Sequence, residues 1–66
     1  MKNRILKSRL SKAGFVRRPK RGKGSHSIWQ HYLYSITVVQ SGKDNSDAKP
    51  YQVKTLKLVL QKIADN

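Results

Sequence analysis

His26 is the side chain whose type and surroundings best suit proton-transfer chemistry. Five basic residues and two glycines lie directly before it, within residues 17–24. The pKa of an ordinary histidine is about 6.5, and nearby cations favour the neutral imidazole that can take the proton of a ribose 2′-hydroxyl. The same cations can stabilise the negative charge that develops on a phosphorane. From the residues alone, this stretch suits either a basic loop that only binds phosphate, with His26 as a surface residue, or a site for metal-independent RNA cleavage. In the second case the general acid can be a water, a lysine or the same imidazole.

The second histidine, His31, is a poor catalytic partner for His26. The alternating pattern of residues 25–31 predicts a strand, and positions five apart on a strand lie on opposite faces, roughly 16 Å from each other. We therefore expect His31 to be structural. One face of this strand carries Ser27, Trp29 and His31, and the other carries His26, Ile28 and Gln30. Either face can be the buried one, although a domain with few large apolar groups favours burial of Trp29.

The sequence offers no recognisable metal or cofactor site. It has no cysteine, and its two histidines and three aspartates are scattered rather than grouped at metal-ligand spacing. A chain of 66 residues also has too thin a core to enclose a large organic cofactor. We therefore expect neither a metal nor a cofactor.

The charge predicts a polyanionic partner. Fifteen Lys and Arg against three Asp and Glu give a formal net charge of +12, and residues 1–43 contain no acid at all. Such a density of basic residues most often indicates nucleic-acid binding. Neither a signal peptide nor a membrane-spanning run is visible, so we expect a cytoplasmic protein that does not bind membranes.

The hydrophobic periodicity predicts five elements in a single domain, 1–66. An amphipathic helix is expected over residues 3–13, capped by Asn3 and ended by Gly14 at the left-handed C′ position. Three antiparallel strands should follow, and then a mobile surface loop over residues 41–50. A second helix should begin between Tyr51 and Thr55 and end near Ala64. The strands are expected over residues 15–18, 25–31 and 34–39. This order is that of an α+β, two-layer α-β-β-β-α sandwich with a three-stranded antiparallel sheet.

Four stretches of the chain resemble one protein family. They are the helix ending AGF (13–15), then RGKGSHSIWQH (21–31), SITVV (35–39) and KTLKLVLQKIA (54–64). The sequence is similar to the HicA family of bacterial toxins, over nearly the whole chain. The resemblance implies a double-stranded-RNA-binding-domain-like fold and an endoribonuclease that cleaves mRNA. It also implies inhibition by an acidic antitoxin of the HicB family. His26 matches the family's catalytic histidine, and Gly24 supports the local backbone.

The sequence departs from the family pattern at three places. Ser27 stands where many members have a second histidine directly after the first. The segment after the third strand reads QSGKDNSDAKP, without the proline and histidine that many members have, and the loop before the second helix is longer. These departures affect any mechanism that needs several histidines, but not one that rests on His26.

RNA contacts are expected from the first helix and from the basic stretch before His26. The predicted RNA-binding residues are Lys7, Arg9, Lys12, Arg17, Arg18, Lys20, Arg21, Lys23, Gly24 and Ser25. Phosphate contacts of this kind are also consistent with two alternative functions for this chain. One is a non-catalytic RNA-binding module of the same fold, and the other is an inactive toxin that still binds its antitoxin.

Overall fold

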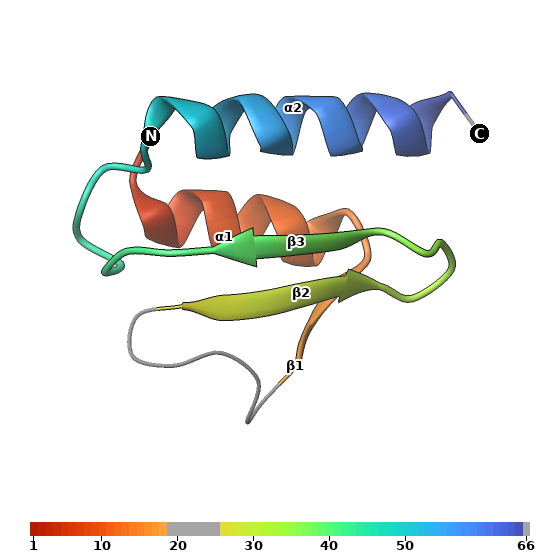
Figure 1. Cartoon of the computed structure of the whole chain (residues 1–66), viewed down its shortest axis with the longest axis horizontal. Helices are drawn as coiled ribbons and strands as arrows, with labels where there is room; N and C mark the ends of the chain where they lie inside the picture. Colours follow the sequence, from red (N-terminus) through yellow and green to blue (C-terminus); the bar gives the residue numbers. More distant parts are fainter. Residues whose placement is uncertain (19–25, 66) are drawn as a thin grey trace.

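The protein is a three-stranded sheet packed against two helices. The computed structural model describes residues 1–18 and 26–65. Figure 1 shows the two helices running side by side along the sheet. The elements, in chain order, are α1 (Asn3–Lys12), β1 (Phe15–Arg18), β2 (Ser27–His31), β3 (Thr37–Gln40) and α2 (Pro50–Ala64). The sheet order is β1-β2-β3 with both pairs antiparallel, which confirms the predicted fold class.

Helix α1 forms where the apolar stripe predicted it, but its N-terminus differs from the prediction. Leu6 and Leu10 are fully buried, and Gly14 adopts a φ of 101° just after the helix, as expected for a C′ glycine. The predicted cap, Asn3, is wrong: Lys2 occupies the N-cap position without a side-chain cap, and Asn3 is the first helical residue. The Asn3 side chain is 1% exposed and bonds the loop between β3 and α2 instead.

The sheet buries the face that carries Trp29. Ser27, Trp29 and His31 are buried in β2, whereas Ile28 and Gln30 are half-buried on the uncovered face. The helices lie on the Trp29 side because the other large core groups gather there. The core consists of Leu6, Leu10, Phe15, Trp29, Val38 and Leu56.

Two strands and one helix begin at positions other than those predicted. Strand β2 begins at Ser27 rather than at residue 25, and β3 spans Thr37–Gln40 rather than residues 34–39. The shift of β3 follows from the connection before it, where the Tyr34 N–H donates to His31 Nδ1. Helix α2 begins at Pro50 because proline suits the first helical position, where its missing N–H costs nothing.

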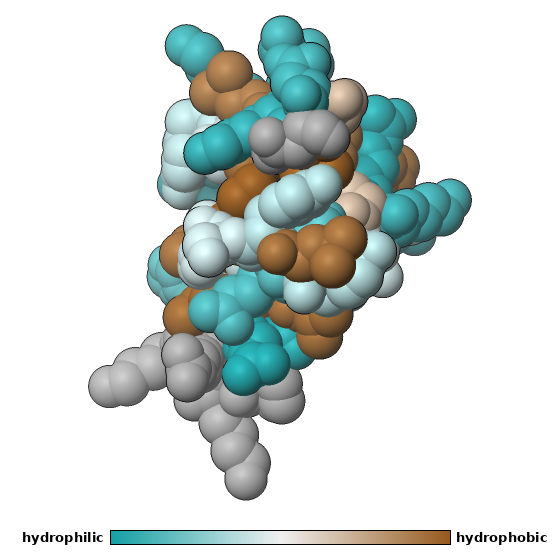
Figure 2. All heavy atoms as spheres, turned by 90° about the vertical axis from the view of Figure 1, so that its right-hand side faces the viewer, coloured by the Kyte–Doolittle hydropathy of each residue, from teal (hydrophilic) through white to brown (hydrophobic). Residues whose placement is uncertain are grey.

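The topology gathers four chain segments at one end of the molecule. The start of α1, the start of β2, the end of β3 and the start of α2 all lie on the left in Figure 1. The β2–β3 connection lies at the opposite end, where Tyr32 and Leu33 are 69% and 65% exposed. Figure 2 looks onto that opposite end and shows hydrophobic side chains set among hydrophilic ones. Because His26 lies at the end where the four segments meet, the predicted functional site is at that end.

Candidate functional site

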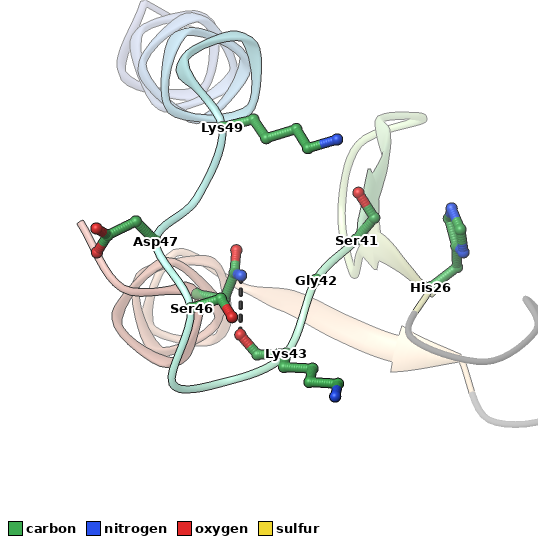
Figure 3. Close-up of a pocket in the computed structure, with 8 residues that line it drawn as sticks. His26, Ser41, Gly42, Lys43, Ser46, Asp47 and Lys49 are labelled. Carbon is green, nitrogen blue, oxygen red and sulfur yellow. Dashed lines mark hydrogen bonds between the residues drawn. The ribbon is translucent and has the colours of Figure 1, made fainter.

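His26 lies exposed at the entrance to β2 and lines a cavity. The register pairs Ser27 with Gln40, so the next residues outward, His26 and Ser41, lie near each other at the end of the sheet. The cavity has a volume of about 300 Å³. Its lining, drawn in Figure 3, consists of Asn3, His26, Ser41, Gly42, Lys43, Ser46, Asp47 and Lys49. A histidine on the rim of such a cavity can reach a bound ligand.

The loop between β3 and α2 forms most of the cavity, and it is tied to α1. The Asn3 N–H donates to the Ser46 carbonyl at 2.9 Å, and the Asn3 side-chain amide donates to the Lys43 carbonyl, also at 2.9 Å. The Ala48 N–H donates to the Met1 carbonyl at 2.7 Å. The loop was predicted to be a mobile surface segment, and these bonds hold it instead against the N-terminus of α1.

Gly42 allows the loop to approach α1 closely. Its φ is 108°, in the left-handed region that side chains rarely adopt. A Cβ at this position would lie 2.5 Å from the Asn3 amide nitrogen. A glycine is therefore required at the cavity wall for two reasons: the positive φ, and the lack of room for a Cβ beside Asn3.

The cavity is bordered by two exposed lysines, Lys43 and Lys49. Its one acid, Asp47, forms an ion pair with Lys2, with 3.6 Å between Nζ and Oδ1. The neighbouring Asp44 is bound by Lys7 at 2.7 Å, and this hydrogen bond lowers the pKa of the Asp44 carboxyl. Among the described residues, the acids of this loop are thus paired with lysines other than Lys43 and Lys49.

A chain of polar side chains connects the cavity to the core. Trp29 Nε1 donates to Ser27 Oγ at 3.0 Å, and Ser27 Oγ donates to Gln40 Oε1 at 3.0 Å. The Gln40 amide then donates to the Ser41 carbonyl at 2.9 Å. From the other side, Gln52 Nε2 donates to Ser41 Oγ at 2.8 Å. The backbone and the hydroxyl of Ser41 are therefore both fixed.

Tyr51 ends this chain at the surface. Its hydroxyl lies 3.5 Å from Ser41 Oγ and accepts a bond from Gln52 Nε2 at 3.2 Å. The contact with Ser41, followed by that with Gln52, lowers the pKa of the Tyr51 hydroxyl.

Ser27, which stands where many family members have a second histidine, has a structural role in this chain. The Ser27 side chain is 2% exposed and faces the helices, on the opposite side of β2 from the uncovered face. A second histidine at this position would enter the core rather than the cavity. The group that stands here is a structural hydroxyl between Trp29 and Gln40.

His31 is structural in its geometry, as predicted. Its Nε2–H donates to the Ala13 carbonyl at 2.8 Å, and its Nδ1 accepts from the Leu33 N–H at 3.0 Å. The ring also packs edge-on against Phe15, with 5.1 Å between centroids, and stacks on Tyr32 at 5.0 Å. Both nitrogens of the ring are therefore engaged in holding the end of α1 to the β2–β3 connection.

The predicted RNA-binding residues fall into three groups. Arg9 and Lys12 on α1, and Arg17 and Arg18 on β1, are exposed. Lys7 is half-buried in its ion pair with Asp44. The others lie outside the described residues: Lys20, Arg21, Lys23, Gly24 and Ser25.

The sequence reasoning missed Ser41, Lys43 and Lys49, which the fold brings to the same cavity as His26. The available signal was the departure from the family pattern itself, since two lysines flank the acids of that longer loop. Across residues 1–18 and 26–65, no group of three or more His, Cys, Asp or Glu side chains is placed to hold a metal ion.

The fold and the site together define a small, strongly basic α-β-β-β-α protein with one histidine at a lysine-bordered cavity. The family model described as the HicA toxin of bacterial toxin–antitoxin systems matches residues 4–63. The chain therefore belongs to the HicA toxin family, and an antitoxin is its expected partner. No curated protein and no solved structure matches it. None of the helices in the described part of the chain is long and apolar enough to span a membrane.

Proposed function

We propose that this toxin is a metal-independent endoribonuclease that cleaves mRNA in the cytoplasm, with His26 in proton transfer. The observation that carries the proposal is the position of His26, exposed at the entrance to β2 and on the rim of a cavity bordered by lysines. Membership of the HicA family supports the same residue, since the sequence resemblance aligns His26 with the family's catalytic histidine and the family match includes that position.

The reaction uses only groups that the chain and the RNA supply. His26 takes the proton of the ribose 2′-hydroxyl as the 2′-oxygen bonds to phosphorus. The bond from phosphorus to the 5′-oxygen breaks, and that oxygen receives a proton from the protonated His26, a lysine or a water. The products are a 2′,3′-cyclic phosphate and a free 5′-hydroxyl, so neither an oxidant nor a metal is required. Nearby cations stabilise the extra negative charge of the phosphorane.

The single histidine of the cavity also favours a second candidate, an RNA-binding module without catalysis. The other histidine of the sequence, His31, is committed to backbone bonds, so an acid–base pair of imidazoles is not available. Such a module would recognise phosphates and 2′-hydroxyls through its basic surface.

Expression of three variants decides between the two candidates. The wild type should arrest growth and degrade mRNA, and His26→Ala should do neither. Gln30→Ala is the matched control, because Gln30 is a polar side chain on the uncovered face of β2, the strand that His26 precedes. Equal arrest by the wild type and His26→Ala refutes the role of His26. If neither degrades RNA and both bind it with the same steep salt dependence, the binding module is correct.

We also propose that the partner is an acidic antitoxin of the HicB family that covers the basic surface. The formal charge of +12 predicts that complex formation weakens as salt rises, because screening reduces the attraction between oppositely charged surfaces. Titration of the purified partner at two salt concentrations measures this, and salt-insensitive binding would indicate an apolar or strand-edge interface.

A further inference from the structure

We infer that the cavity beside His26 is the subsite for the scissile phosphate, and that Lys43, Lys49 and the Ser41 hydroxyl contact it. This inference rests on the proposed function, because it assigns the groups that stabilise the reacting phosphate. It adds a role for the loop between β3 and α2, the segment in which this chain departs most from its family's pattern.

The loop between β3 and α2 supplies all three of these groups, and the sheet register brings the loop next to His26. Ser41 follows β3 and lies beside His26, because the register places the two residues next to each other beyond the pair Ser27–Gln40. Lys43 is fixed through its carbonyl, which accepts the bond from the Asn3 side chain. Lys49 is the N-cap residue of α2. In Figure 3 its side chain extends from the start of that helix across the cavity, toward Ser41 and His26.

The charges around the cavity favour an anion. Asp47 is the acid of the lining, and its carboxylate is paired with Lys2. The second acid of the loop, Asp44, is paired with Lys7. In residues 1–18 and 26–65, the ion pairs therefore leave the ammonium groups of Lys43 and Lys49 available to a ligand. Figure 3 shows the exposed Lys43 side chain extending away from Lys49, so Lys43 reaches the phosphate through a change of its side-chain rotamer. Together the two cations would offset the charge of a phosphorane, which exceeds that of the bound diester.

The size of the cavity and the fixed position of Ser41 support the same ligand. A volume of about 300 Å³ is at the small end of ligand sites, and suits one phosphodiester with its ribose rather than a folded RNA. Ser41 Oγ accepts a bond from Gln52, so its own hydrogen is available to an acceptor. In the structure the acceptor within reach is the Tyr51 hydroxyl at 3.5 Å, and a charged phosphate oxygen would be the stronger one.

Variants that remove the charge of each lysine test the inference by comparing the effect on kcat with the effect on RNA binding. Lys43→Gln and Lys49→Gln should each lower kcat for a short RNA by about a hundredfold to a thousandfold, the range seen when one group that stabilises developing charge is removed. Binding of the 2′-deoxy analogue of the same oligonucleotide should weaken less than tenfold. The matched control is Lys57→Gln, exposed on α2 and about 12 Å further along that helix from Lys49. If both cavity variants behave like Lys57→Gln, the inference is wrong.

A second measurement separates this inference from the proposed function. Inorganic phosphate, added to the isotope-labelled wild type, should shift the amide resonances of Ser41 and Lys43, and the double Lys→Gln variant should lose these shifts. Shifts at these residues in a protein that cleaves no RNA would support the subsite and refute the nuclease. RNA cleavage together with phosphate shifts confined to α1 and β1 would support the nuclease and refute the subsite.

Discussion

Replacement of Ser27 by alanine should destabilise the protein strongly although it removes a single oxygen atom. Ser27 Oγ accepts from Trp29 Nε1 and donates to Gln40 Oε1, and all three side chains are buried. Ser27→Ala leaves Trp29 Nε1 and Gln40 Oε1 without these hydrogen bonds in the core, while the Gln40 amide keeps its bond to the Ser41 carbonyl. Each orphaned buried group costs about 1–3 kcal/mol, so we expect a total loss of about 2–6 kcal/mol for the two groups.

This loss is a large share of the stability of so small a domain. A chain of 66 residues has a free energy of unfolding of about 3–10 kcal/mol. One kcal/mol shifts Tm by about 4–8 °C at this size, so Ser27→Ala should lower Tm by at least about 8 °C. Urea unfolding followed by far-UV circular dichroism measures the change in free energy directly, and this signal remains in variants that lack Trp29, the single tryptophan of the chain. The matched control is Ser35→Ala in the exposed β2–β3 connection, with an expected change within about 0.5 kcal/mol.

A double-mutant cycle identifies the cause of the loss. Trp29→Phe removes the indole donor, so Ser27→Ala should cost about 1 kcal/mol less in that background than in the wild type. Equal costs in the two backgrounds, or a Ser27→Ala variant as stable as Ser35→Ala, would refute the argument from buried hydrogen bonds. Ser27→His should destabilise without a gain in RNA cleavage, because position 27 faces the core. A stable and more active Ser27→His variant would contradict this placement.

Three further predictions concern the loop and the buried histidine. Gly42→Ala should lower the free energy of unfolding in urea by about 2–4 kcal/mol, because alanine is strained at this positive φ and its Cβ displaces the Asn3 amide. A loss below about 1 kcal/mol would show that the loop adjusts freely. The pKa of Asp44 is lowered by Lys7, so its stabilisation is complete above the unfolded pKa, near 4, and is lost as the pH falls through the lower folded value. Tm measured from pH 6 to pH 2 should therefore fall less in Asp44→Asn than in the wild type, and parallel curves would exclude this contribution. His31→Phe should lower the free energy of unfolding by about 2–4 kcal/mol, because the backbone groups bonded to the two ring nitrogens lose their partners. An unchanged Tm would show that water replaces these bonds.

Much of the architecture could be predicted from local sequence patterns. The stripes of both helices, the glycine after α1 and the alternation in β2 depend on residues close together in the chain, for which periodicity is a direct physical signal. The same alternation correctly separated His31 from His26, because neighbouring residues of a strand point to opposite faces. The boundaries of β3 were predicted less well, because the His31 side chain binds the backbone of the connection before it.

Only the tertiary structure decided which face of β2 is buried and what lies beside His26. Ile28 and Trp29 are both apolar, so the sequence alone left either face possible. The choice depends on Phe15, Val38 and the two helices, which gather on the Trp29 side. Likewise, Asn3 lies forty residues from Lys43 in the chain, and the hydrogen bond between them closes the loop around the cavity. The sequence by itself determined a basic α+β protein with a candidate histidine. Long-range packing added the lysines of the loop, because no local pattern records which distant segments meet.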